Sequence, residues 1–545
     1  MKYSRRKFEV PLAAALLLPC GSAFAQSATV TLSSAKQYIR GFGGMNHAAW
    51  AGDLTAAERT LAFGNADGQM GLSALRIPVT DGSPDSVNVA TAKAAIAAGA
   101  IVFATPWNAA GAMSAAQFPS YATHLTNFVS YMKNQSVDLY AIGVQNEPDY
   151  GAQAGWGSWT AALCHDFLLS YAGSVGTKLM SCESFSYAKS YYDPILNDSA
   201  ALAKATIFGT HLYGTAVGSY AYPLFDSKAT GKERWMTEHY TDSTTDANSW
   251  PNALGVASEI HNAMVTGQFN LYTWWYIKRS YGFINNGAVT KRGWCIAHWS
   301  KFVRPGFYRV DATAAPTAGV SVSAYKGDTS VVIVVVNTNT SSKPLTVTVD
   351  GSSISSFTRY TTSSTKSMAN DGKVTASNGS LSVTLDASSV TTLLGTGASS
   401  GGTVGAGGAV GSMGGAGGST GGVSGSTGAA GGSTGGTVGS VAGAAGTQNG
   451  AGSGAGGGSS DGLGGQNTEQ GGGGASTTNG ASGAGTAATA GSLTDSGGSA
   501  AAGTPTDTQS GCTCQAVGIA RPDWSSFSPL LLGLVGLVSR RRRSR

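Results

Sequence analysis

Eight short apolar runs, rich in residues that favour β-strands, recur in the first half of the chain, and segments with helix-like spacing separate them. Eight strands that alternate with helices are the sequence pattern of a (β/α)8 barrel, in which the strands are parallel. Segments 121–133 and 256–265, for example, carry apolar residues at helical spacing. The eight runs are 39–45, 74–79, 101–107, 139–146, 178–183, 207–213, 234–238 and 271–277.

A different pattern begins after about Arg309, where short alternating runs are separated by turns. This pattern predicts a small antiparallel β-domain. We therefore expect an α/β protein with a barrel over 26–309 and a β-domain over 310–397, which also takes a strand from about 27–38. The runs of the β-domain are 320–325, 330–337, 345–349, 356–361, 381–385 and 390–394.

Almost every residue from about 398 to 506 is Gly, Ala, Ser or Thr, and the motif GGSTGG occurs at 417–422 and 431–436. Such a segment has few large apolar side chains, so burial cannot offset the entropy cost of ordering it. We predict a flexible linker over 398–510.

The amino terminus has the organisation of an export signal. Basic residues at positions 2–7 precede an apolar run at 10–18, and Ala23-Phe24-Ala25 follows as a small-residue cleavage site. We predict a signal peptide over 1–25. Because Arg5 and Arg6 are adjacent, the segment also resembles a twin-arginine signal, and both export routes remain open.

The carboxyl terminus, residues 511–545, combines Cys512 and Cys514, a short apolar stretch at 527–538 and a cluster of arginines. The stretch is shorter than the ~20 residues that a stable membrane-spanning helix needs. The arrangement resembles the myxobacterial-type C-terminal sorting tag, which implies processing at the cysteines and anchoring at the cell surface. The alternative is an unprocessed hydrophobic tail. We expect a protein that is secreted or held at the cell surface.

The formal net charge of +5 comes from the two ends of the chain, since most of the excess Lys and Arg lies in the signal segment and the terminal arginine cluster. The body of the protein is near neutral, which argues against a nucleic-acid partner. We expect a monomer.

Three cysteines remain in the body of the chain, namely Cys164, Cys182 and Cys295. An exported protein permits a disulfide, and Cys164 with Cys182 is the plausible pair. Three cysteines without histidines at ligand spacing do not make a zinc site. We therefore expect no metal and no cofactor.

Two of the predicted barrel strands end in glutamate. Glu147 follows the fourth strand in the sequence VQNEP, and Glu238 ends the seventh in WMTE. Active sites of such barrels lie at the carboxyl ends of the strands. Retaining hydrolysis of a glycoside needs two carboxyl groups about 5–5.5 Å apart. The alternative for each glutamate is a surface residue or half of an ion pair, but two in these contexts favour a catalytic pair.

Five motifs follow one another along the chain: GFGGMNH at 41–47, VQNEPDY at 144–150, HLYG at 211–214, WMTE at 235–238 and WWYIKRSY at 274–281. Together and in this order they resemble glycoside hydrolase family 30, and specifically its bacterial glucuronoxylanase branch. The resemblance covers nearly all of 28–394 and implies a TIM barrel with an attached antiparallel β-sandwich side domain.

The resemblance implies catalytic roles for matching positions. Glu147 would be the acid/base and Glu238 the nucleophile. Asn146 would hydrogen-bond the sugar 2-hydroxyl beside the nucleophile, an interaction that strengthens in the transition state.

The resemblance also implies a supporting set. Tyr213 and His211 would orient the nucleophile, Trp107 and Trp275 would flank the sugar, and Arg76 would support the carboxylates. The alternative for the tryptophans is core packing, and for His211 it is a buried imidazole with a structural partner.

Arg279 and Tyr276 would determine specificity, because in this branch the equivalent arginine binds the carboxylate of a 4-O-methylglucuronic acid substituent on xylan. A guanidinium suits a carboxylate because it is planar, bidentate and always charged. The alternative is a structural ion pair. Two features depart from the branch: a shorter segment at 107–113 without the usual prolines, and Asp242 and Asp246, whose charges would repel a uronate.

The leading hypothesis is a retaining endo-1,4-β-xylanase that acts on glucuronoxylan, with xylan as its partner. A second hypothesis is another family 30 activity, such as a β-1,6-galactanase or a β-glucosidase. A third is a surface protein that binds carbohydrate without catalysis.

Overall fold

The computed structural model describes residues 26–80, 86–107, 111–240 and 246–397. The predicted signal peptide, linker and sorting tag lie outside the described residues. Within the described ranges, no helix combines the length and apolar character needed to cross a bilayer.

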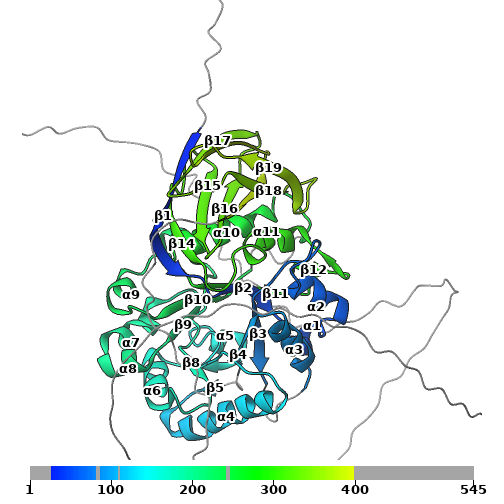
Figure 1. Ribbon diagram of the computed structural model, residues 1–545. Coiled ribbons are helices and arrows are strands. Elements are labelled where there is room, and N and C mark those ends of the chain that lie inside the picture. Colours follow the sequence, from blue (N-terminus) through cyan, green and yellow to red (C-terminus); the bar gives the residue numbers. More distant parts are fainter. Residues whose placement is uncertain (1–25, 81–85, 108–110, 241–245, 398–545) are drawn as a thin grey trace, which may run out of the picture. The chain divides into compact units, whose positions relative to one another are not determined.

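Eight parallel strands close into a barrel, which confirms the predicted fold class (Figure 1). Strand β3 has all six residues buried, as expected for a parallel strand covered on both faces. The strands, in order around the barrel, are β2 (Gly41–Met45), β3 (Ala74–Val79), β4 (Ile101–Pro106), β6 (Ala141–Gly143), β8 (Lys178–Met180), β9 (Ile207–His211), β10 (Glu233–Glu238) and β11 (Leu271–Tyr276).

Helices connect the barrel strands, and α4 (Phe118–Asn134) buries one face. In α4 the buried residues recur every three or four positions, at 118, 121, 122, 125, 128, 129 and 132, which is the helical period. The helices are α1 (Ala48–Ala51), α2 (Ala56–Phe63), α3 (Val89–Ala97), α4 (Phe118–Asn134), α5 (Gly151–Ala154), α6 (Ala161–Tyr171), α7 (Asp193–Asn197), α8 (Ser199–Lys204), α9 (Pro223–Lys228), α10 (Leu254–Val265) and α11 (Lys291–Ser300).

Two small two-stranded sheets lie in the loops of the barrel. They are β5 (Gly111–Ala112) with β7 (Gly157–Ser158), and β12 (Ile284–Asn285) with β13 (Ala288–Val289).

The side domain is one nine-stranded sheet in the order β19-β18-β21-β16-β15-β14-β1-β17-β20. Neighbouring strands are antiparallel except β1 and β17, which are parallel, with Val30 opposite Val349. The strands are β1 (Gln26–Tyr38), β14 (Tyr308–Ala312), β15 (Val320–Lys326), β16 (Ser330–Asn337), β17 (Lys343–Asp350), β18 (Ser356–Thr362), β19 (Ala369–Thr375), β20 (Ser380–Leu385) and β21 (Ser389–Thr396).

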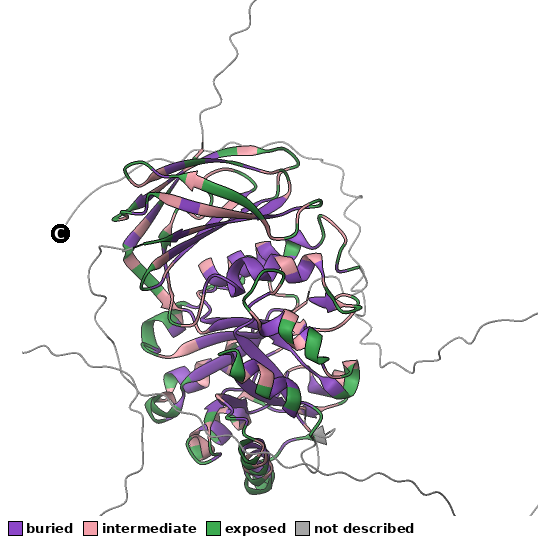
Figure 2. Ribbon diagram, turned by 45° about the vertical axis from the view of Figure 1, so that its right-hand side comes forward, coloured by how far each residue is buried: buried purple, intermediate pink, exposed green. Residues whose placement is uncertain are grey.

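The two faces of strand β16 pack into different cores, and this packing holds the sheet to the barrel. Its residues Val331, Ile333 and Val335 belong to the core of the side domain, which also contains alternate residues of β17 and β20. Its residues at 332, 334 and 336 belong to the core of the barrel and its helices. Successive side chains of a strand point to opposite faces, so one strand joins the two cores. Figure 2 shows buried residues running from the barrel through the helices beneath the sheet.

A buried histidine forms hydrogen bonds across this junction. His298 of α11 hydrogen-bonds Thr392 through Nδ1 at 2.8 Å and Thr362 through Nε2 at 2.9 Å. Burial lowers the pKa of His298 to about 3, so its ring stays neutral.

Cys164 of α6 and Cys182, just after β8, form a disulfide, and the third cysteine, Cys295, is a buried thiol.

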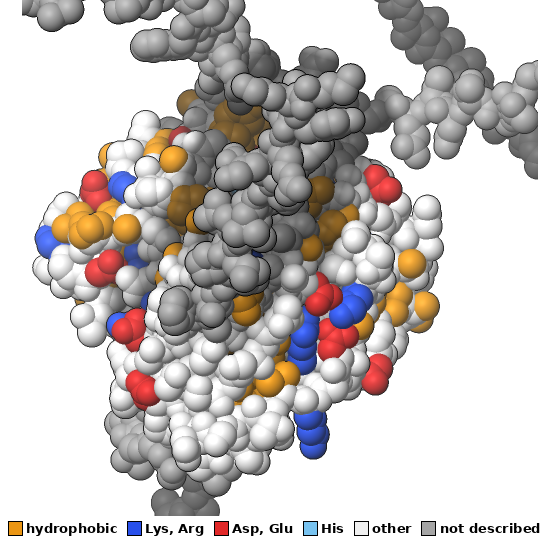
Figure 3. Space-filling model, turned by 90° about the horizontal axis from the view of Figure 1, so that it is seen from above, with side chains coloured by type: hydrophobic (Ala, Val, Ile, Leu, Met, Phe, Trp, Pro, Cys, Tyr) orange, Lys and Arg blue, Asp and Glu red, His pale blue; other side chains and the backbone are white. Residues whose placement is uncertain are grey.

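On the outside of the protein, acidic and basic side chains are interspersed across the face that Figure 3 shows.

Candidate active site

Charged side chains from five barrel strands converge inside the carboxyl end of the barrel. Each of them is buried, with at most 4% of the residue exposed to solvent. The group consists of Arg76 from β3, Glu147 after β6, Glu183 after β8, His211 from β9 and Glu238 from β10.

The two glutamates of the predicted pair lie close together. One carboxylate oxygen of Glu147, one of Glu238 and a ring nitrogen of His211 all lie within 4.8 Å of one another. This separation suits two carboxyl groups that act on the same glycosidic carbon, one from each side.

Arg76 forms hydrogen bonds with several residues of the site. It is fully buried and donates hydrogen bonds to Glu238, to Asn146 Oδ1 at 2.7 Å and to Glu183 Oε2 at 3.1 Å. Burial would lower the pKa of Arg76, but the charges of Glu183 and Glu238 outweigh it and raise the pKa. The guanidinium therefore remains charged and neutralises much of the negative charge of the site.

Glu147 accepts a hydrogen bond from His211 Nδ1 at 2.8 Å. Burial, followed by the charge of Glu238, raises the pKa of Glu147 to about 7 against the lowering effect of His211. Burial opposes protonation of His211, but the charge of Glu238, the hydrogen bond to Glu147 and the nearby Glu183 carboxylate raise its pKa to about 9. The pair thus holds protons near neutral pH, as a general acid requires.

We expected His211 to orient the nucleophile, and the geometry differs. Its hydrogen bond goes to Glu147, and its Nε2 lies 3.9 Å from Glu238. The ring Nδ1 faces Glu147, and Nε2 lies 3.5 Å from Nη2 of Arg76, whose guanidinium bonds Glu238. Tyr213 does contact Glu238, since its hydroxyl donates to Oε1 at 2.9 Å.

The backbone of Glu147 is strained. Its φ is 42°, in the left-handed region that side chains other than Gly and Asn rarely adopt. Its backbone N–H donates to the carbonyl of Glu183 at 2.8 Å. Strain of this kind persists where the surrounding structure holds it, and it is typical of functional sites.

Three tryptophans form a wall beside the carboxylates. Trp107 and Trp275 are partly exposed, with ring centroids 6.0 Å apart. Trp50, which the sequence did not single out, lies 6.0 Å from Trp107 and 6.2 Å from Trp275 and is 48% exposed. Its position just after the first barrel strand, in the sequence NHAAW, was the available signal. Exposed indole faces are suited to stacking on sugar rings.

Arg279 lies at the edge of this wall, with its guanidinium carbon 4.7 Å from the ring centre of Tyr276. No carboxylate among the described residues forms an ion pair with Arg279, and its buried Nε lacks a hydrogen-bond partner there. Asp246 is exposed, and its Oδ1 accepts from the backbone of Asn248 at 2.9 Å. Asp242 and residues 108–110 of the altered segment lie outside the described residues.

Sequence reasoning also missed Glu183 and Thr105. Glu183 ends the fifth predicted strand, as Glu238 ends the seventh, and this position was the signal that could have identified it. Thr105 donates to Glu183 at 2.7 Å and accepts from Arg76 Nε at 3.1 Å.

By spacing alone, Glu147, His211 and Glu238 could offer three ligand atoms to a metal ion. Their surroundings disfavour a cation. Arg76 already bonds Glu238, and the raised pKa of His211 keeps a proton where a metal would need a lone pair.

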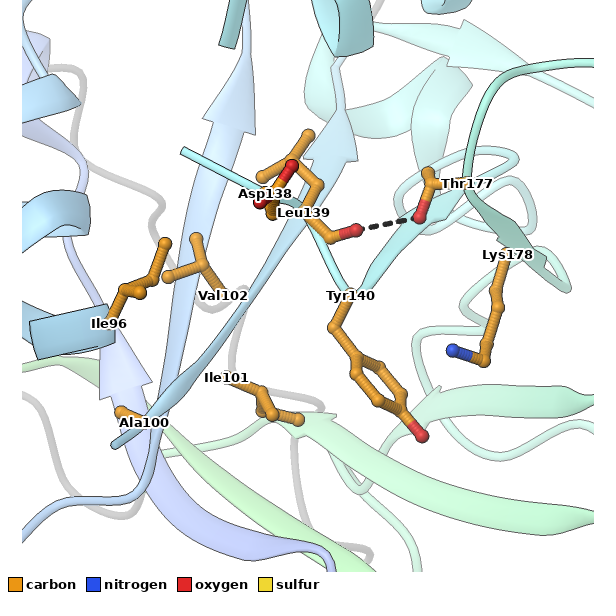
Figure 4. Close-up of a pocket in the computed structure, with 9 residues that line it drawn as sticks. All are labelled: Ile96, Ala100, Ile101, Val102, Asp138, Leu139, Tyr140, Thr177 and Lys178. Atoms are coloured by element: carbon orange, nitrogen blue, oxygen red, sulfur yellow. Dashed lines mark hydrogen bonds between the residues drawn. The ribbon is translucent and has the colours of Figure 1, made fainter. Parts of the chain in front are cut away.

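A hollow of about 490 Å³ lies at the opposite end of the barrel, beside the beginnings of β4, β6 and β8 (Figure 4). The ammonium of Lys178 lies 3.8 Å from the ring centre of Tyr140, and Thr177 donates to the carbonyl of Leu139 at 2.7 Å. This hollow contains none of the convergent carboxylates.

A (β/α)8 barrel with two convergent carboxylates and a tryptophan wall defines a glycoside hydrolase. No protein-family model matches the chain. It is 48% identical over 363 residues to the glucuronoxylanase XynC of Bacillus subtilis (strain 168), covering 63% of this chain and 86% of that protein.

Solved structures of family 30 xylanases are also similar to this chain. A GH30 endoxylanase from Clostridium papyrosolvens C71 has a TM-score of 0.64 at 38% identity. The family 30 subfamily 8 xylanase Xyn30A of Clostridium acetobutylicum has 0.63 at 32%. Each alignment covers 68% of this chain and the whole of the other. The chain belongs to glycoside hydrolase family 30.

Proposed function

We propose that this protein is a retaining endo-1,4-β-xylanase that cleaves glucuronoxylan. The observation that carries the mechanism is the approach of Glu147 and Glu238 to within 4.8 Å. An inverting enzyme needs carboxyl groups farther apart, about 6.5–9.5 Å, to leave room for water. The similarity to proteins named glucuronoxylanase and xylanase supports the substrate.

In the proposed first step, a Glu238 oxygen attacks the anomeric carbon while Glu147 gives its proton to the departing glycosidic oxygen. A glycosyl ester on Glu238 and a shortened xylan chain result. In the second step, Glu147 takes a proton from water, the water oxygen attacks the anomeric carbon, and Glu238 leaves as a carboxylate. The configuration of the anomeric carbon is retained after two inversions.

The neighbours of the pair support both steps. Hydrogen bonds from Arg76 and from the hydroxyl of Tyr213 hold the Glu238 side chain in one orientation. Asn146, whose Oδ1 accepts from Arg76, would present its amide N–H groups to the sugar 2-hydroxyl. Trp107 and Trp275 would stack against the sugars.

For substrate choice, we propose that Arg279 binds the carboxylate of a 4-O-methylglucuronic acid substituent. An arginine that forms no ion pair with the described residues is available for a ligand anion, and the nearby Tyr276 restricts its orientation. Asp246 is the described one of the two aspartates whose charge would repel a uronate. Its Oδ1 accepts a hydrogen bond from the backbone N–H of Asn248, within its own turn.

We further propose that the protein is exported by its first 25 residues and held at the cell surface by its last 35, with residues 398–510 as the tether. Cell fractionation with an antibody against the barrel would test this. Protein found in the cytoplasmic fraction alone would contradict it.

The experiment that tests the catalytic proposal is product analysis on three substrates: glucuronoxylan, undecorated arabinoxylan and a β-1,6-linked glycan. We expect oligomers from glucuronoxylan that each carry one glucuronate at a fixed position by mass spectrometry, and a β-anomer as the first product by NMR. Glu238→Gln is the inactive control. Faster release from the β-1,6-linked glycan, or an α-anomer first, would overturn the proposal.

A further inference from the structure

A third carboxylate lies behind the catalytic pair. Glu183 is fully buried, with none of its side chain exposed to solvent, and it is not placed to touch a substrate. Its Oε2 accepts from Arg76 at 3.1 Å and lies 3.6 Å from His211 Nε2, while its Oε1 accepts from Thr105 at 2.7 Å. Glu183 thus contacts both the residue that holds Glu238 and the residue that holds Glu147.

The adjoining strands leave room for this side chain. A Cβ atom added at Gly143 of β6 would lie 2.6 Å from Glu183 Oε1, and one added at Gly209 of β9 would lie 2.9 Å from its Cγ. Glycine on both flanking strands therefore permits a glutamate to occupy the barrel interior. A buried charge is costly unless it is paired and hydrogen-bonded, and Glu183 is both.

We propose that Glu183 is a positioning residue of the hydrolase, which fixes Arg76 and His211 and so sets the placement of Glu238 and the protonation of the Glu147–His211 pair. This inference rests on the proposed retaining function. Because Glu183 itself stays behind Arg76 and His211, it acts through them and not on the substrate.

The charges around Glu183 predict a specific signature. Burial opposes its ionisation, but Arg76 and His211 outweigh burial and lower the pKa of Glu183. Removing this negative charge makes every neighbouring proton easier to lose. The charged and titratable groups around it are Arg76, Glu147, His211 and Glu238 and, one layer further out, Asp149 and Tyr213.

The test compares Glu183→Gln, Glu183→Asp and the control Glu233→Gln in the full chain, with glucuronoxylan as substrate. Glu233 is also a barrel carboxylate paired with an arginine, Arg40, but it lies at the beginning of β10, at the other end of the barrel. Melting temperature and circular dichroism establish that each variant folds.

For Glu183→Gln we expect kcat to fall about 10²-fold with little change in KM, since misplacement of catalytic groups by about 1 Å has this effect. The alkaline limb of kcat/KM should move to lower pH by about one unit. Glu183→Asp should lower kcat but keep the limb, because it keeps the charge. Glu233→Gln should keep both.

An unmoved alkaline limb in folded Glu183→Gln would overturn the inference, even if kcat falls, because a packing defect alone lowers kcat without moving the limb. If Glu183→Gln does not fold, Glu183→Asp decides the question: wild-type kcat would overturn the inference, and a lower kcat with unchanged KM and an unmoved alkaline limb would support it. A wild-type chain that does not hydrolyse glucuronoxylan would instead refute the proposed function.

Discussion

Glu147 and Glu238 meet in the barrel interior with carboxylate oxygens within 4.8 Å, although they belong to strands separated by two others around the barrel. Glu147 bonds His211, and Glu238 bonds Arg76 and Tyr213. The two carboxyl groups therefore have different environments, which is the basis for different roles.

Replacing each glutamate should separate those roles. Glu238→Ala should reduce xylan hydrolysis to background, because no glycosyl ester can form. Glu147→Ala should reduce kcat by about 10²–10⁴-fold, as expected for loss of a general acid/base. Added azide should restore turnover of Glu147→Ala and yield a β-glycosyl azide, detected by NMR. An α-glycosyl azide from Glu147→Ala would mean that the two roles are exchanged.

The pH profile should report the raised pKa of Glu147. Because the acid must be protonated at the first step and its pKa is raised to about 7, kcat/KM should fall as the pH rises through about 7. Initial rates on glucuronoxylan between pH 4 and 9 measure this limb. An alkaline limb near the ordinary pKa of glutamate, about 4.3, would contradict the assignment.

Arg279 should govern the choice of substrate. In Arg279→Ala we expect kcat/KM on glucuronoxylan to fall about 10–100-fold, the equivalent of a charged hydrogen bond worth ~1.5–3 kcal/mol. The rate on undecorated xylan should stay nearly constant. Arg279→Lys should recover only part of the preference, because an ammonium cannot form the bidentate contact. Equal losses on both substrates would refute a role in recognition.

His298 should make the junction of barrel and sheet sensitive to acid. Its folded-state pKa of about 3 lies below the unfolded value of 6.5, so its contribution to stability is present above pH 6.5 and is lost as the pH falls toward 3. Between pH 6.5 and 5 the loss is about 2 kcal/mol.

Denaturant unfolding of the wild type and of His298→Gln at pH 7 and pH 5 measures this loss. We expect His298→Gln to be less stable than the wild type at pH 7, because the amide cannot reproduce both threonine hydrogen bonds. The difference should narrow at pH 5. A difference that does not change with pH would show that His298 does not titrate on unfolding.

The barrel could be predicted because each of its strands is a local pattern. A short, buried parallel strand reads as an apolar run, and β3, β10 and β11 lie within one residue of the predicted bounds. The glutamates at strand ends were visible for the same reason, since a polar residue that ends an apolar run stands out in sequence. The catalytic roles of Glu147 and Glu238 remain predictions.

The partners of those residues could not be read from local patterns. The sequence alone determined which segments become strands and which polar residues terminate them, because these depend on the period of a few neighbouring side chains. Only the tertiary structure decided that His211 bonds Glu147, that Glu183 joins the cluster through Arg76, and that β1 lies between β14 and β17. Barrel closure and strand register set these contacts, and both depend on packing between distant segments.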